Sequence, residues 1–547
     1  MSRRQPEILE SDTEELYAIL ERSKTGPLSD EDRELLAATF ETLSFVQTEL
    51  EKEKASVVRL RKIFSINTKK TEKTSDVLKG EDPEEQPEEK SDEEKEKKKK
   101  KKKGHGRNGA DAYTGAEKID VPHESLKHGD LCPRCPKGKL YWKKPLRLVR
   151  LKGQAPISAK CWELERLRCN LCGDAFTATA PADVGEKKYD ETAVSMIALL
   201  KYGSGLPFYR LAKLEGALGI PLPASTQWDL VADLAKACLP VYEELIRSGA
   251  QGNLFYHDDT TMKILELLKE NQRIENEGSK ERTGMFTTAV VAIWEEHRIA
   301  LFFTGRQHAG ENLKDVLEKR AAELDQPIQM CDGSSRNESE ALNTILCNCL
   351  THGRRKFVEV ADSFPRECRH ILKTLCIVYK NDSKTRKQKM SPEERLLFHQ
   401  EHSAVLMKDL ESWMNEQLTE KKIEPNSSLG NAFSYMLKRW DKLTLFLRVP
   451  GAPLDNNICE QTLKKAILHR KNALFYKTLN GAHVGDIFMT SFYTAELSGA
   501  NPFDYLVALS KHAEEVRNAP QQWMPWNYQA ARAALGEAAA ADDGSLP

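Results

Sequence analysis

The chain has 547 residues, of which 40% are hydrophobic and 30% are charged, and its formal net charge is −1. This length accommodates several domains, and the composition indicates both globular and strongly solvated parts. No apolar run is long enough to span a bilayer, and the first residues lack the apolar core of a signal peptide. We therefore expect a protein of the cytoplasm rather than a membrane or secreted protein.

Residues 13–65 are expected to form an amphipathic helix. Leu36, Leu43, Leu50 and Val57 recur at a seven-residue period, which is typical of a coiled coil. A helix that packs on its own domain explains the pattern equally well, because several of the alternating seam positions are polar.

Residues 66–110 have a low-complexity sequence. An acidic block from Glu81 to Glu96 runs into the lysines Lys97–Lys103. Such a segment cannot bury a core, so its composition predicts a disordered linker. Two roles remain open for the lysines, contact with DNA phosphates without sequence readout and simple solvation.

Residues 111–187 contain two CxxC pairs, Cys132 with Cys135 and Cys169 with Cys172. Four thiolates are a ligand set of tetrahedral zinc, and in a cytoplasmic chain this spacing favours metal over disulfides. The interval between the pairs can hold two or three short strands, so the sequence predicts a zinc ribbon that binds Zn²⁺. Whether the ribbon binds DNA or only stabilises a small domain is left open.

Residues 188–250 are expected to be helical and to resemble a helix-turn-helix. An apolar helix at 193–202 precedes a helix at 209–218 that ends at Gly219, and Ser225 is placed to cap a third helix. Any two helices joined by a turn can show this pattern, so the pattern alone does not establish DNA binding.

Residues 251–365 change from a helical pattern to a strand pattern. Three strands, a helix and a fourth strand follow one another, at 254–257, 286–293, 299–303, 312–323 and 327–331. This is the element order of a ribonuclease H-like α/β fold, in which the first and fourth strands are neighbours. Asp258 and Asp332 follow those two strands, so we expect their carboxylates to meet at one edge of the sheet.

The remaining residues divide into three parts. Residues 366–450 are helical and charged, and we expect them to form an insertion in the core. Residues 451–490 should return to the core with a helix that carries a glutamate. Residues 491–547 should add C-terminal helices and a frayed tail.

The helix expected near residue 455 carries an unusual set of polar side chains. Asp455 is a good N-cap, and a helix that starts there places Asn456, Asn457 and Glu460 on one face. Asparagine is a poor helix former, so two of them in a first turn are uncommon on a plain surface helix. A capped surface helix with an ion pair between Glu460 and Lys464 is the alternative interpretation.

Asp258, Asp332 and Glu460 form a candidate set of three carboxylates. Hard oxygen ligands suit Mg²⁺ or Mn²⁺. Two such ions a few ångströms apart can activate an attacking oxygen and stabilise a leaving oxygen in phosphoryl transfer. The hypothesis depends on the fold bringing the three side chains together, because single acidic residues usually lie on the surface.

From about Gly104 to Leu509, the sequence resembles the DDE-type transposases of the insertion sequence family numbered 66. The resemblance is carried by the two CxxC pairs and by the segments Gly104-His-Gly-Arg-Asn-Gly, Ala198-Leu-Leu-Lys-Tyr-Gly-Ser-Gly-Leu-Pro-Phe-Tyr209, Asp258-Asp-Thr-Thr, Asp332-Gly, Cys349-Leu-Thr-His-Gly-Arg-Arg-Lys-Phe357, Asp455-Asn-Asn-Ile-Cys-Glu460 and Arg470-Lys-Asn-Ala-Leu-Phe475. It implies a multidomain protein with an α/β ribonuclease H-like catalytic core and a helical insertion. A coiled-coil helix, a zinc ribbon and a helical DNA-binding region would precede that core.

The resemblance also implies a metal-dependent enzyme that cleaves phosphodiesters at element ends and transfers strands into target DNA. Asp258, Asp332 and Glu460 would be the catalytic and Mg²⁺-binding residues. The residues expected near the DNA are His352, Arg354, Arg355, Lys356, Asn456, Asn457, Lys464, Arg470 and Lys471. For the two asparagines, orientation of the helix start is an equal alternative to DNA contact.

The expected partners are element-end and target DNA, further copies of the chain and small accessory transposition proteins, in a bacterial, nucleoid-associated setting. The competing hypothesis is a non-catalytic zinc-ribbon DNA-binding protein with an inactive ribonuclease H-like core. A decayed element would usually lose one acidic residue, and here all three motifs are intact, which favours the enzyme.

Overall fold

The computed structural model describes residues 13–24, 26–39 and 187–536, except 277–281, 335 and 338–341. Between 121 and 185 it describes residues 121, 123, 125–131, 133, 139–141, 155–168, 175–181, 184 and 185. The chain divides into two compact units, Met1–Pro83 and Glu84–Pro547. None of the helices in the described ranges is long and apolar enough to cross a membrane.

The first unit contains helix α1 (Thr13–Ser23) and helical residues at 30–39. Arg22, in the last turn of α1, forms an ion pair with Asp32 at 2.6 Å, which ties the two helical segments together. The predicted seam of the coiled coil lies outside the described residues from Leu43 onward, so the coiled coil stays a prediction.

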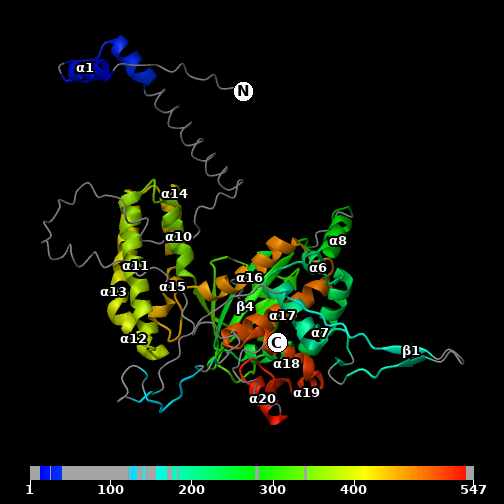
Figure 1. Ribbon diagram of the computed structural model, residues 1–547. Helices are drawn as coiled ribbons and strands as arrows, with labels where there is room; N and C mark the ends of the chain where they lie inside the picture. Colours follow the sequence, from blue (N-terminus) through cyan, green and yellow to red (C-terminus); the bar gives the residue numbers. More distant parts are fainter. Residues whose placement is uncertain are drawn as a thin grey trace. The chain divides into compact units, whose positions relative to one another are not determined.

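A five-stranded mixed sheet forms the centre of the second unit (Figure 1). Its strands are β3 (Leu254–Thr261), β4 (Phe286–Trp294), β5 (His297–Gly305), β6 (Ile328–Cys331) and β7 (Ile345–Asn348), in the order β5-β4-β3-β6-β7. The first three strands pair antiparallel, and β3–β6 and β6–β7 pair parallel. Residues 287–292 of β4 are all buried, because helices cover the sheet.

The predicted neighbourhood of the first and fourth strands is confirmed. Tyr256 of β3 lies opposite Met330 of β6 in the parallel register. Asp258 and Asp332 each lie two residues further along their chains, so the register carries both to the same end of the sheet. The hairpin predicted for 286–303 is also confirmed, because β4 and β5 pair along their full length.

Helices from distant parts of the sequence pack against this sheet. α7 (Ala224–Ala250) contacts β4 and β5, α9 (Ala309–Leu317) and α16 (Asn457–Ala473) contact β3 and β4, and α17 (Leu479–Leu497) contacts β5. The core contains Val231 of α7, Leu301 of β5 and Phe488 of α17, all of them fully buried. The sheet is therefore the common support of the elements that carry the candidate acids.

Helices of the predicted insertion form a bundle joined to β7 (Figure 1). They follow α10 (Leu350–Val360) and comprise α11 (Pro365–Lys387), α12 (Pro392–His402), α13 (Ala404–Thr419), α14 (Ser428–Leu437), α15 (Trp440–Leu443) and η4 (Leu445–Leu447). In the described part of this unit the remaining helices are α5 (Glu191–Ala198), η3 (Leu199–Gly203), α6 (Phe208–Ala217), α8 (Leu265–Asn276), α18 (Pro502–Lys511), α19 (Ala513–Asn518), η5 (Pro520–Gln522) and α20 (Tyr528–Ala534).

Two predicted helix caps, Asp455 and Ser225, are wrong. α16 begins at Asn457 with Asn456 as its N-cap residue. Asp455 lies one residue before that N-cap, and its carboxylate accepts the backbone N–H of Asn457. α7 begins at Ala224, and Ser225 lies inside its first turn without capping it. α6 and α7 contact each other, as the predicted pair of helices requires, but α7 is also part of the core that covers the sheet.

The region of the predicted zinc ribbon contains two short antiparallel strands, β1 (Arg166–Arg168) and β2 (Ala175–Thr177). The four CxxC cysteines lie outside the described residues, as does the whole predicted linker with its lysine run. The ribbon and the linker therefore stay predictions.

Candidate active site

Asp258 lies in the second half of β3, where the strand pairs with β4 but extends beyond β6. The backbone N–H of Asp259 donates to one of its carboxylate oxygens at 2.8 Å. Burial raises the pKa of Asp258 to about 7, and the negative charges of Asp332 and Glu460 reinforce this shift. Asp258 is thus a half-buried acid whose ionisation is opposed by its surroundings and by two neighbouring carboxylates.

Asp332 follows the last residue of β6 and is held by its own loop. The side-chain amide of Asn337 donates to Asp332 Oδ1 at 2.7 Å, and the backbone N–H of Ser334 donates to the same oxygen at 3.2 Å. Asn337 is 2% exposed, so this hydrogen bond is shielded from water.

A buried chain of hydrogen bonds links this loop to β3. Gln329 Nε2 donates to the backbone oxygen of Asn337 at 2.7 Å and lies 2.8 Å from His257 Nε2. Burial lowers the pKa of His257 to about 4, so its imidazole is neutral at physiological pH. The residue before Asp258 is in this way connected to the loop that carries Asp332.

Glu460 is in the first turn of α16 and is positioned by the N-cap residue of that helix. Asn456 is fully buried, and its side-chain amide donates to the backbone oxygen of His257 at 3.0 Å. Its backbone N–H donates to Cys349 Sγ at 3.3 Å. These contacts join the start of α16 to β3 next to Asp258 and to the start of α10.

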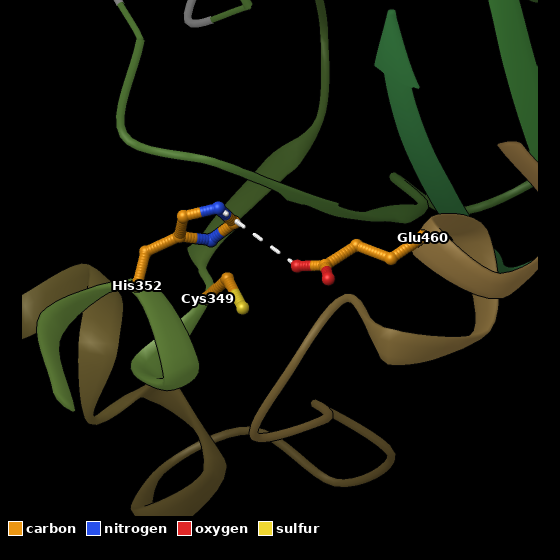
Figure 2. Close-up of side chains that lie close together, drawn as sticks. All are labelled: Cys349, His352 and Glu460. Carbon is orange, nitrogen blue, oxygen red and sulfur yellow. Dashed lines mark ion pairs between the residues drawn. The ribbon is translucent and has the colours of Figure 1, made fainter. Parts of the chain in front are cut away.

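Two side chains of α10 face the carboxylate of Glu460. His352 Nε2 is 3.8 Å from Glu460 Oε1, and Figure 2 marks this pair with a dashed line. Arg355 Nη2 is 3.9 Å from Glu460 Oε2. Burial lowers the pKa of His352, although the negative charge of Glu460 acts in the opposite direction. The basic cluster predicted from the sequence therefore adjoins one of the three candidate acids.

A cavity of about 310 Å³ lies beside Asp332. Its lining combines the acidic loop, the basic cluster and one aromatic residue of the insertion, namely Asp332, Gly333, Ser334, His352, Arg355, Lys356, Glu359 and Tyr435. Of the predicted basic residues, His352, Arg355 and Lys356 line the cavity, and Arg354 lies on the same helix.

The other residues predicted to lie near DNA have different surroundings. Asn457, Lys464 and Lys471 are exposed on α16. Arg470 donates to the hydroxyl oxygens of Thr260 and Thr261 at 2.8 and 3.0 Å, which ties α16 to the end of β3. Asn456 is inside the protein, where it orients the start of α16.

Sequence reasoning missed several residues that shape this site. Arg439 Nη2 donates to the backbone oxygen of Gly333 at 2.9 Å, and its guanidinium lies 4.4 Å from the ring centroid of Tyr435. Asn337 and Gln329 were also not singled out. The pair Asp332-Gly333 was the available signal, because a glycine after an acidic residue permits a close approach by another segment.

The three carboxylates come from β3, the loop after β6 and α16, and they offer only oxygen ligands. Mg²⁺ and Mn²⁺ prefer such ligands, and a divalent cation offsets the burial and the neighbouring negative charges that raise the pKa of Asp258. The ligand types of these three residues therefore suit a divalent cation. The predicted zinc ligands lie outside the described residues.

Comparison with known proteins identifies the family. Residues 187–484, which contain all three acids, match the model of the Transposase IS66 family. The uncharacterized protein y4jD of Sinorhizobium fredii is 26% identical over 393 residues, which cover 68% of this chain and 73% of that protein. The uncharacterized protein y4hP of the same organism is 24% identical over 391 residues and 68% of each chain. The chain belongs to the IS66 family of transposases.

Proposed function

We propose that this protein is a DNA transposase whose catalytic residues are Asp258, Asp332 and Glu460. The observation that carries the proposal is that Asp258 is half-buried near the negative charges of Asp332 and Glu460, although the three residues come from distant parts of the chain. Such a group of half-buried carboxylates is costly without a cation, so it indicates a functional site rather than a structural one.

Each acid has a defined structural role in this proposal. Asp258 is fixed by β3, Asp332 by Asn337 and Ser334, and Glu460 by the buried N-cap residue of α16. Two Mg²⁺ ions held by these carboxylates would supply Lewis-acid activation of the attacking and leaving oxygens of a phosphodiester. The reaction would be cleavage at the element ends followed by transfer of the freed 3′-hydroxyl strand into target DNA.

The basic side chains near the acids would hold the DNA backbone. Arg355 and Lys356 line the cavity beside Asp332, and Arg355 also faces Glu460. Guanidinium and ammonium groups at these places would neutralise phosphates on either side of the scissile bond. His352, whose pKa is lowered, would contribute a neutral imidazole to the same wall of the cavity.

The proposed domain plan assigns the ribonuclease H-like core to 251–365 and 451–490, with 366–450 as its helical insertion. The strand order and the position of the insertion support this assignment. Residues 13–65, 111–187 and 188–250 would serve assembly and DNA binding, with Zn²⁺ in the ribbon. Further copies of the chain and small accessory proteins would complete the transposition complex.

The test compares three variants in Mg²⁺-dependent strand transfer while binding to element ends is measured in parallel. Asp258→Asn and Glu460→Gln should each lower the strand-transfer rate on the order of 10³-fold or more, because a metal site acts as a unit. Asp259→Asn is the matched control. The Ala309 N–H donates a hydrogen bond to the Asp259 carboxylate at 3.2 Å, and the amide oxygen of asparagine at this position can still accept it. Most activity should therefore remain.

Wild-type rates in Glu460→Gln would remove this residue from the site. End binding without strand transfer in the wild-type protein would favour the alternative, a DNA-binding protein with an inactive core.

A further inference from the structure

Cys349, His352 and Glu460 form a cluster that the proposed Mg²⁺ chemistry does not use as a unit (Figure 2). Cys349 is the N-cap residue of α10, His352 is in the first turn of that helix, and Glu460 comes from α16. One potential ligand atom from each residue lies within 4.8 Å of the other two. Two segments more than a hundred residues apart thus bring a sulfur, a nitrogen and an oxygen ligand to one point.

Two polar atoms of this cluster are buried without a hydrogen-bond partner. They are Nδ1 of His352 and Oε1 of Glu460. The 3.8 Å between His352 Nε2 and Glu460 Oε1 is also too long for a hydrogen bond. Buried polar atoms are nearly always satisfied in native proteins, so these two atoms point to a further group that binds between the side chains.

Two features stabilise a metal-bound thiolate at Cys349, although burial raises the pKa of the free thiol to about 11. The backbone N–H of Asn456 donates to Sγ at 3.3 Å. The start of an 11-residue helix adds the partial positive charge of its free N–H groups. Both features stabilise negative charge on the sulfur once a metal has displaced its proton to solvent.

We infer that Cys349, His352 and Glu460 bind Zn²⁺, with water in the fourth position. One thiolate, one imidazole and one carboxylate match the ligand types of zinc, whereas Mg²⁺ requires oxygen ligands. Because Glu460 is one of the three proposed catalytic acids, bound Zn²⁺ withdraws it from the Mg²⁺ site and inhibits strand transfer. This inhibitory part of the inference rests on the proposed function, and the metal site itself does not.

The binding test uses the full-length protein without DNA or Mg²⁺. Zn²⁺ is titrated against a chromogenic chelator, and bound equivalents are compared between variants, so that zinc held elsewhere in the chain cancels. Wild type should bind one equivalent more than Cys349→Ser or His352→Ala. Loss of an outer-shell partner lowers metal affinity about 10–100-fold. The zinc affinity of these two variants should fall by more than that.

Two controls make this comparison specific. Cys347→Ser removes a buried thiol two residues away, whose sulfur contacts the backbone oxygen of Pro453, and it should keep the extra equivalent. Asp258→Asn should also keep it, which separates this site from binding at the three carboxylates. An unchanged zinc count and affinity in both Cys349→Ser and His352→Ala would overturn the site, and two variants are used in case one fails to fold.

The inhibition test measures the Zn²⁺ concentration that halves Mg²⁺-dependent strand transfer, relative to the zinc-free rate of each variant. This concentration should rise about 10-fold or more in Cys349→Ser and stay at the wild-type value in Cys347→Ser. Equal inhibition of both variants would overturn the inhibitory role. A wild-type protein without Mg²⁺-dependent activity would overturn the proposed function instead, and the zinc count would still decide the metal site.

Discussion

Asn456 and Asn457 are adjacent amides with opposite surroundings. Asn456 is 0% exposed and donates to the backbone oxygen of His257, whereas Asn457 is exposed on α16. Asn456→Asp removes that donor and adds a buried negative charge near Asp258 and Glu460. The free energy of unfolding should therefore fall by about 1–3 kcal/mol, as measured by urea denaturation. Asn457→Asp is the matched control, and equal unfolding midpoints for the two variants would contradict the role given to Asn456.

At the scale of residues, the sequence was enough to identify the three candidate acids but not the residues that position them. Asp258 and Asp332 follow apolar strand patterns, and Glu460 follows a helix-start pattern, so each could be singled out from local order. The contact between Gln329 and His257 depends on the register of β3 against β6, and the burial of Asn456 depends on how α16 packs. Neither follows from residues that are close in the sequence.

At the scale of elements, the helical insertion contacts the loop that carries Asp332. Arg439 donates to the backbone oxygen of Gly333, and a Cβ atom at residue 333 would come within 2.8 Å of Arg439 Cδ and 2.9 Å of Tyr435 Oη. Gly333→Ala should therefore displace the side chains of Arg439 and Tyr435 and lower the free energy of unfolding by about 1–3 kcal/mol. It should also reduce strand transfer more than end binding.

A double-mutant cycle tests the interaction between Arg439 and residue 333. In an Arg439→Ala background the added cost of Gly333→Ala should fall by at least about 0.5 kcal/mol, because the main obstructing side chain is gone. Gly305→Ala is the control, since a Cβ atom there meets nothing within 4 Å. Strictly additive costs in the cycle would show that Arg439 and residue 333 do not interact.

The elements themselves were predictable to different degrees. β4 and β5 have long β-branched and aromatic runs, and their hairpin could be read from the sequence. β7 has only four residues and a Cys-Asn end, so its strand character depends on pairing with β6, and the sequence did not reveal it. α9 begins at Ala309, three residues before the predicted start, and Glu311 in its first turn accepts the backbone N–H of His308 at 3.1 Å.

At the scale of the whole molecule, α17 covers the exposed edge of the sheet. Asp486, Thr490 and Thr494 recur every four residues on this helix, and their oxygens accept the backbone N–H groups of Thr304, Phe302 and Ala300 at 2.8, 3.0 and 3.1 Å. These N–H groups belong to the edge strand β5 and would otherwise be free to pair with another chain. α17 also crosses the predicted boundary at residue 490, so the core and the C-terminal helices share one element.

Asp486 makes this edge contact sensitive to pH. Burial raises its pKa to about 7, although hydrogen bonds from Thr304 act in the opposite direction. Below about pH 4 the carboxyl is protonated in both states, and its contribution to stability is fully present. Between about pH 4 and 7 only the unfolded chain ionises, so that contribution is lost at roughly 1.4 kcal/mol per pH unit.

The last prediction follows from this loss of stability with rising pH. Asp486→Asn keeps an acceptor for Thr304 N–H but cannot ionise. The free energy of unfolding of the wild type, relative to this variant, should fall by on the order of 4 kcal/mol as the pH rises from about 4 to above 7. Urea denaturation of both proteins across this range measures the difference. Asp233→Asn, at a side chain that is 75% exposed, is the control and should show a much smaller change. A pH-independent difference between the wild type and Asp486→Asn would mean that Asp486 titrates normally and that the edge contact is open to water.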